Sequence, residues 1–126
     1  MTRINKFIDL IEQGQAIFSL PAEEASYEAG REMSQTWADM IQFDFEHKPF
    51  DVGGLTAFMK GLKDGGPTLS GHQTPAVITT VPSNCMTPEE VQYNAWQIRH
   101  VLTAGVHGVL HTHARREDAV RMFVAA

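Results

Sequence analysis

Two carboxylates and an imidazole lie close together in the first half of the chain, in a segment whose side chains alternate between apolar and polar. If this segment is a strand, Asp44 and Glu46 share one face, and His47 follows where the strand ends. A carboxylate-steadied histidine suits general acid–base catalysis, and carboxylate oxygens bind divalent cations directly or through water. The alternative interpretation is a solvated edge strand whose acids form ion pairs with Lys48 or Arg31.

Two further histidines, His111 and His113, occur at alternate positions near the C-terminus. In a strand they would share a face with Val109. Such a pair can ligate zinc or iron, but the sequence offers no third ligand at a suitable spacing. His113, at the end of the predicted strand, is the better candidate for a functional site.

The elements that must position these side chains alternate along the chain. Amphipathic periodicity predicts helices, and short β-branched or apolar runs that end at proline predict strands. The clearest local signal is Thr87-Pro88-Glu89-Glu90, where threonine caps a helix and Glu90 reaches back to complete a capping box. Tyr27 and Trp37 are expected on the buried side of the second helix. Helices are expected over about residues 4–13, 22–37, 55–64, 88–104 and 115–126, and strands over 16–20, 39–46, 76–81 and 108–113.

A leading helix followed by four strand–helix units predicts an α/β protein with a parallel sheet and right-handed crossovers. Residues 1–126 contain no linker or repeat, so we expect a single domain. Two arrangements suit four units: a small doubly wound sandwich, or the first half of a TIM (β/α)8 barrel, which would be an incomplete barrel.

Composition excludes several classes of function. The formal net charge of −5 and the absence of basic runs argue against nucleic-acid binding. The N-terminus lacks the apolar core of a signal peptide, no apolar run is long enough to cross a bilayer, and the single Cys85 suits a reducing compartment, so we expect a cytoplasmic protein. Cys85 is expected to be an inert thiol, and His72, His100 and His107 to be solvated. The loop over residues 65–72 is expected to be only a connection.

The run Asp44-Phe45-Glu46-His47-Lys48-Pro49 resembles the HpcH/HpaI aldolase/citrate lyase family, whose second strand carries Asp-x-Glu-His-x-Pro. The resemblance covers the whole chain, including the leading helix with Gly14, the third strand ending at Pro82 and the turn over residues 102–106. An atypical subgroup with Ser-Gly-His before the third strand is more similar still.

The resemblance implies an eight-unit barrel, usually assembled into oligomers, that makes or cleaves carbon–carbon bonds through a pyruvate-type enolate on Mg²⁺ or Mn²⁺. A cation bound to the keto acid would stabilise the enolate charge. By this resemblance His47 acts as acid and base, Asp44 orients it, and Glu46 holds metal-bound water. Thr80 and His113 would line the pocket of the 2-oxo acid substrate.

Three departures from the family pattern bear on this expectation. Thr80 stands where the family has a substrate-binding arginine, and Thr103 where it has an aspartate. The family's direct metal ligands belong to strands five and six, and are therefore expected outside this chain. The resemblance nevertheless implies a class II, metal-dependent aldolase-like lyase. The alternative is a non-catalytic half-barrel subunit, or a carboxylate-binding protein, that pairs with itself or with a companion chain carrying the second half.

Overall fold

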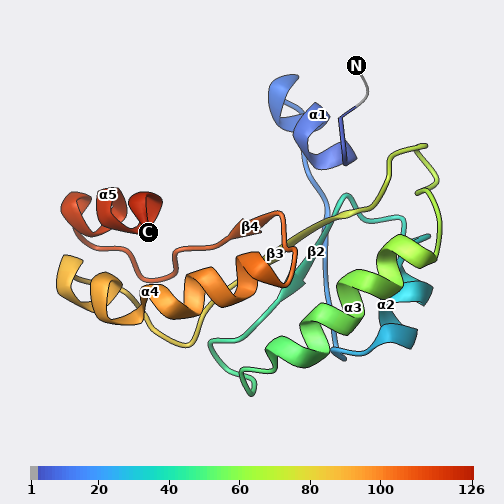
Figure 1. The fold of residues 1–126 in the computed structure, drawn as a ribbon. Coiled ribbons are helices and arrows are strands. Elements are labelled where there is room, and N and C mark those ends of the chain that lie inside the picture. Colours follow the sequence, from blue (N-terminus) through green and yellow to red (C-terminus); the bar gives the residue numbers. More distant parts are fainter. Residues whose placement is uncertain (1–2) are drawn as a thin grey trace.

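After its first helix the chain alternates strands and helices, as the sequence predicts (Figure 1). The structure is a computed structural model, and it describes residues 3–126. The elements are α1 (Lys6–Glu12), β1 (Ser19–Pro21), α2 (Tyr27–Met33), β2 (Met40–Phe43), α3 (Val52–Asp64), β3 (Ala76–Thr79), α4 (Pro88–Thr103), β4 (Gly108–Val109) and α5 (Glu117–Ala125).

The four strands form one parallel sheet in the order β1-β2-β3-β4. Ile41 of β2 is paired with Leu20 of β1 and with Val77 of β3, so these three residues lie in one row across the sheet. A doubly wound sheet requires a reversal of strand order, and the order of these four strands contains none. The alternation of strands and helices and the parallel pairing of all four strands confirm the predicted α/β class and parallel sheet.

Two helices cover one face of the sheet. Ile41, Phe43 and Val77 belong to the same buried cluster as residues of α3 and α4. Because side chains alternate along a strand, Met40 and Gln42 point to the opposite face, where they are only half-buried. The helical residues of the cluster are Leu55, Phe58 and Leu62 of α3 and Val101 of α4.

Helices α2 and α3 run side by side and touch through their backbones (Figure 1). A Cβ added to Gly61 would lie 2.1 Å from the carbonyl oxygen of Tyr27, and one added to Gly30 would lie 2.1 Å from that of Phe58. Glycine is therefore required at both positions. This close contact fixes α2 against the helix that buries the sheet.

The two edges of the sheet, where the strands begin and end, carry different side chains. At the amino edge, Lys6 of α1 forms an ion pair with Asp39, which precedes β2. The carboxyl edge carries Asp44 after β2 and Thr80 after β3.

None of the helices in the described residues is long and apolar enough to cross a membrane.

Several elements are shorter than predicted, for local reasons. Helix α2 begins at Tyr27 because the side chain of Ser26 caps it, accepting from the backbone N–H of Ala29, so Glu23 and Glu24 lie outside its first turn. Trp37 is 66% exposed, so its predicted place on the buried side is wrong. Strands β2 and β4 end early, at Phe43 and Val109, and both shortenings alter the site.

Candidate functional site

A tight turn replaces the predicted end of the second strand. The Oδ1 atom of Asp44 accepts hydrogen bonds from the backbone N–H groups of Glu46 and His47, at 3.0 and 3.2 Å. Aspartate favours turns because its side chain bonds the backbone two or three residues ahead. The prediction that Asp44 and Glu46 share a strand face is therefore wrong, but the turn brings the two carboxylates and His47 together.

Thr80 supports this turn from the neighbouring strand. Its hydroxyl accepts from the backbone N–H groups of Phe45 and Glu46, at 2.9 and 3.1 Å, and donates to Asp44 Oδ1 at 3.3 Å. The register pairs Phe43 with Thr79, which places Thr80 directly beside Asp44. Thr80 is only 3% exposed, so its hydroxyl positions the turn.

The imidazole of His47 lies against Asp44, with Nδ1 2.8 Å from Oδ2. This hydrogen bond, together with the charges of Asp44 and Glu46, raises the pKa of His47 above its ordinary value. Partial burial works against ionisation of Asp44, but the hydrogen bonds from His47 and Glu46 outweigh it and lower the pKa of the carboxyl. The ring of His47 is 71% exposed, so its Nε2 edge is accessible to a ligand.

Glu46 lies between two histidines. Its Oε1 atom is 3.9 Å from His47 Nε2 and forms a hydrogen bond with His113 Nε2. The side chain of Glu46 is only 14% exposed, whereas His113 is half exposed. The backbone of His113 has a φ of 56°, a left-handed conformation uncommon outside glycine, which turns the chain after β4 toward Glu46.

His111 lies elsewhere, so the prediction that the two C-terminal histidines share a strand face is wrong. Its Nε2 donates to the carbonyl oxygen of Cys85 at 2.8 Å, and its ring stacks on Phe123 of α5 at 4.2 Å. Cys85 itself has a φ of 50° and is fully buried, and burial raises the pKa of its thiol. His111 therefore ties the β3–α4 loop to α5, and the Cys85 thiol lies buried behind it.

The cluster contains a set of atoms suited to a divalent cation. One ligand atom from each of Asp44, Glu46 and His47 lies within 4.8 Å of the other two. Two carboxylates and an imidazole suit Mn²⁺, while Mg²⁺ prefers the oxygens and keeps several waters. The donor set therefore fits the predicted cation, with Glu46 as the most enclosed of the three.

A cavity of about 290 Å³ opens beside the turn, between β2 and the segment that leads into α2. Asp44 and Lys48 line it, together with Glu23 and Glu24. Lys48 Nζ is 3.3 Å from a carboxylate oxygen of Glu23, so the predicted alternative in which Lys48 pairs with the acids of the turn is not found. Lys48 is the cation in this cavity wall, a role that the sequence did not reveal because it suggested only an ion pair of Lys48 with the acids of the strand.

Two histidines expected to be solvated are at the amino edge and are enclosed. His107 Nδ1 accepts from the backbone N–H of Val77 at 2.9 Å, and burial lowers the pKa of His107. His72 is 8% exposed and bonds Asp9 of α1. His100 is exposed, as predicted.

The chain matches no protein-family model and no curated protein.

Proposed function

We propose that the chain carries the acid–base part of a metal-dependent carbon–carbon lyase acting on a 2-oxo acid. The observation that carries the proposal is the 2.8 Å contact between Asp44 and His47, next to a second carboxylate. A general base near neutral pH needs a pKa close to the operating pH and an accessible nitrogen. The ring of His47 is exposed, and the neighbouring carboxylates raise its pKa above the ordinary 6.5.

His47 Nε2 would take a proton from the carbon next to the keto group and return it in the reverse direction. Asp44 holds the ring by its Nδ1 edge, which leaves Nε2 as the nitrogen that faces solvent. Glu46 would hold the water shell of Mg²⁺ or Mn²⁺, with the Asp44 carboxylate as a further oxygen donor and direct ligands supplied from beyond the described residues, while His47 Nε2 stays free for the proton. When bound, the cation supplies charge neutralisation for the enolate.

The substrate carboxylate needs a partner, because Thr80 occupies the position of the family's arginine. Lys48 is the candidate for this role, since its ammonium lies in the wall of the cavity beside Asp44, where it would exchange its 3.3 Å pair with Glu23 for the substrate carboxylate. His113, bonded to Glu46 and half exposed, would line the other side of the pocket. Thr80 would contribute by holding Asp44 and the turn in place.

The test is deuterium exchange at the methyl group of pyruvate in D₂O with Mn²⁺, followed by proton NMR. We expect exchange above the metal-only background, and a loss of about 100-fold in His47→Ala, the usual scale of general-base catalysis. His100→Ala is the matched control, because His100 is exposed on α4. An unchanged rate in His47→Ala, or no exchange in the wild type, contradicts the proposal.

The same proposal includes the predicted fold, in which the four strand–helix units form half of a (β/α)8 barrel. An unreversed parallel order is the order found in a barrel, and four units are half of eight.

A second candidate function is a non-catalytic half-barrel that binds a carboxylate and pairs with a second copy or a companion chain. It is favoured by the edge strands β1 and β4, each of which pairs with one strand within residues 3–126, and by the exposed Phe18 and Leu110 beside them. Light scattering and metal analysis of the purified protein separate the two: a cation-free monomer or dimer without exchange activity supports the half-barrel.

A further inference from the structure

A second cluster of reactive side chains lies at the opposite, amino edge of the sheet. Ser70 Oγ is 2.8 Å from His72 Nδ1, and His72 Nε2 is 2.7 Å from Asp9 Oδ2 of α1. The loop is closed so that the serine and histidine converge: the backbone N–H of Thr68 donates to the carbonyl of His72, and Gly71 between them has a φ of 80°. The three groups thus form a continuous serine–histidine–aspartate array.

The direction of the hydrogen bonds follows from the available donors. A carboxylate only accepts, so His72 Nε2 carries the proton that bonds Asp9. His72 Nδ1 is then an acceptor, and the hydroxyl of Ser70 donates to it. Thr68 extends this series of hydrogen bonds. Because the proton of Ser70 is directed to His72, the Thr68 hydroxyl donates to Ser70 Oγ at 3.0 Å, and it accepts from the His72 backbone N–H at 3.1 Å.

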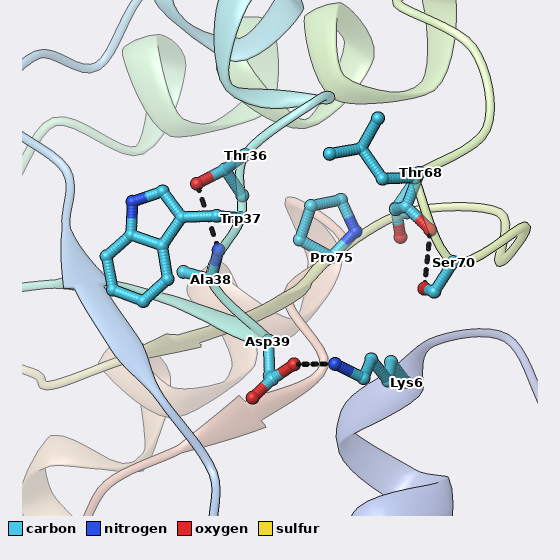
Figure 2. A pocket seen from close by; sticks show the side chains of 10 residues that line it. Lys6, Thr36, Trp37, Ala38, Asp39, Thr68, Ser70 and Pro75 are labelled. Atoms are coloured by element: carbon cyan, nitrogen blue, oxygen red, sulfur yellow. Dashed lines mark hydrogen bonds and ion pairs between the residues drawn. The ribbon is translucent and has the colours of Figure 1, made fainter.

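Ser70 opens into a cavity of about 240 Å³, whereas His72 is buried behind it. Figure 2 shows Trp37 on the opposite side of this cavity from Ser70, with the Lys6–Asp39 pair along another side. An exposed hydroxyl within hydrogen-bond reach of a histidine that a third group orients is the arrangement of an activated serine. A bond that merely attached α1 to the loop would need His72 and Asp9 alone.

The walls of the cavity indicate the kind of ligand. Trp37 and Leu69 are exposed and apolar, so they can contact an alkyl or aryl group. The carboxylate of Asp39 lies 2.7 Å from Lys6 Nζ and neutralises its charge, so the cavity favours an uncharged molecule. The ion pair uses one of the three N–H donors of the lysine ammonium and leaves two. The volume is below the about 300–1,000 Å³ of pockets for drug-sized ligands, which favours a small ester.

We propose that Ser70, His72 and Asp9 form a second catalytic site that hydrolyses small, uncharged carboxylic esters. Ser70 Oγ attacks the carbonyl carbon while its proton passes to His72 Nδ1. The alcohol leaves with that proton as the tetrahedral intermediate collapses to an acyl-serine. Water then attacks the acyl group, gives a proton to His72 and releases the acid, and the proton returns to Ser70. Asp9 holds the ring and compensates its positive charge, and Lys6 supplies an N–H donor for the oxyanion.

The experiment measures p-nitrophenyl butyrate hydrolysis and labelling by a fluorophosphonate, with mass spectrometry to locate the label. We expect label on Ser70 and its loss in Ser70→Ala. We expect about a 100-fold lower hydrolysis rate in His72→Gln, the scale of a lost general base. Ser19→Ala, which removes an exposed serine of β1, is expected to leave both readouts unchanged.

A structural role for the array is distinguished by a second variant. Ser70→Cys keeps a nucleophile beside His72, so we expect its alkylation by iodoacetamide to be about tenfold faster than in Ser70→Cys/His72→Gln, because a neighbouring base increases the thiolate fraction. Thermal unfolding shows that each variant is folded. No label on wild-type Ser70, or equal alkylation rates in the two folded cysteine variants, overturns the proposal. This site and the lyase site share no residue, so either can fail alone.

Discussion

Asp44 fixes His47 twice: one carboxylate oxygen lies 2.8 Å from the imidazole Nδ1, and the other accepts the backbone N–H of the same histidine at 3.2 Å. A single residue therefore sets both the position of the ring and its affinity for a proton. The consequence is that orientation and acidity of His47 change together when Asp44 is altered.

The first prediction concerns the titration of His47. Asp44→Asn removes the carboxylate charge and leaves only a weaker amide acceptor for His47 Nδ1, so we expect the pKa of His47 to fall toward its ordinary 6.5. Glu46→Gln, which removes a smaller contribution, is expected to lower it less. NMR of the imidazole carbons against pH measures both. Equal pKa values in wild type and Asp44→Asn contradict the assignment.

The same pair makes a prediction for stability against pH. The raised pKa of His47 adds stability that is present below its unfolded value of 6.5 and is lost as pH rises through the folded value. The lowered pKa of Asp44 adds stability that is present above 3.8 and is lost as pH falls through the folded value. Wild type and Asp44→Asn should therefore differ most in urea unfolding between these ordinary values. A difference that stays constant from about pH 5 to about pH 9 contradicts the coupling.

The support of the turn by Thr80 gives the third prediction. Thr80→Val keeps the shape but leaves the N–H group of Phe45 without its acceptor and that of Glu46 with Asp44 alone, and we expect about 2 kcal/mol of lost stability. Thr80→Ser keeps the hydroxyl and should lose less. The control is Thr103→Val, whose exposed hydroxyl only bonds the Arg99 carbonyl one turn back. Equal losses in Thr80→Val and Thr103→Val would show that the Thr80 hydroxyl does not support the turn.

Much of the fold could be predicted from the sequence because its signals are local. Leu55, Phe58 and Leu62 follow helical spacing and are all fully buried in α3. Thr87 caps α4 as predicted, accepting from the backbone N–H of Glu90. Glu90 reaches the N–H of Met86, one residue before the position that a capping box requires.

The site was harder to predict because long-range contacts override local pattern. The alternation of residues 40–46 favours a longer strand, but the bonds from Thr80, 36 residues away, turn the chain at Asp44. His111 and His113 have the spacing of one strand face, yet Cys85 and Glu46 draw them apart. The Thr-x-Ser-x-His spacing before β3 was the available signal for the second array, but its third member, Asp9, lies 63 residues from His72.

The contact between α2 and α3 gives a fourth prediction: two glycine-to-alanine substitutions in α3 should change stability in opposite directions. Gly61→Ala places a methyl group 2.1 Å from the Tyr27 carbonyl, so we expect at least about 2 kcal/mol of lost stability from strain. Gly53 is in the same helix, exposed, with 3.6 Å to its nearest neighbour. Gly53→Ala is expected to gain about 0.5 kcal/mol, because alanine favours helices. Thermal unfolding measures both, and equal effects would show that the helices are farther apart.

The last prediction concerns Mn²⁺ at the carboxyl edge of the sheet. Glu46 lies between His47 and His113, so a cation held there should broaden the NMR signals of both rings more strongly than those of His100. Glu46→Gln keeps the size of the side chain and removes its charge, and we expect Mn²⁺ affinity to fall about tenfold or more. Glu117→Gln is the matched control, because Glu117 is an exposed acid that pairs with Arg121 on α5. Because the test reads binding and needs no turnover, it tests the cation site independently of the exchange activity. Equal affinities in the two variants would assign the carboxylates of the turn to folding alone.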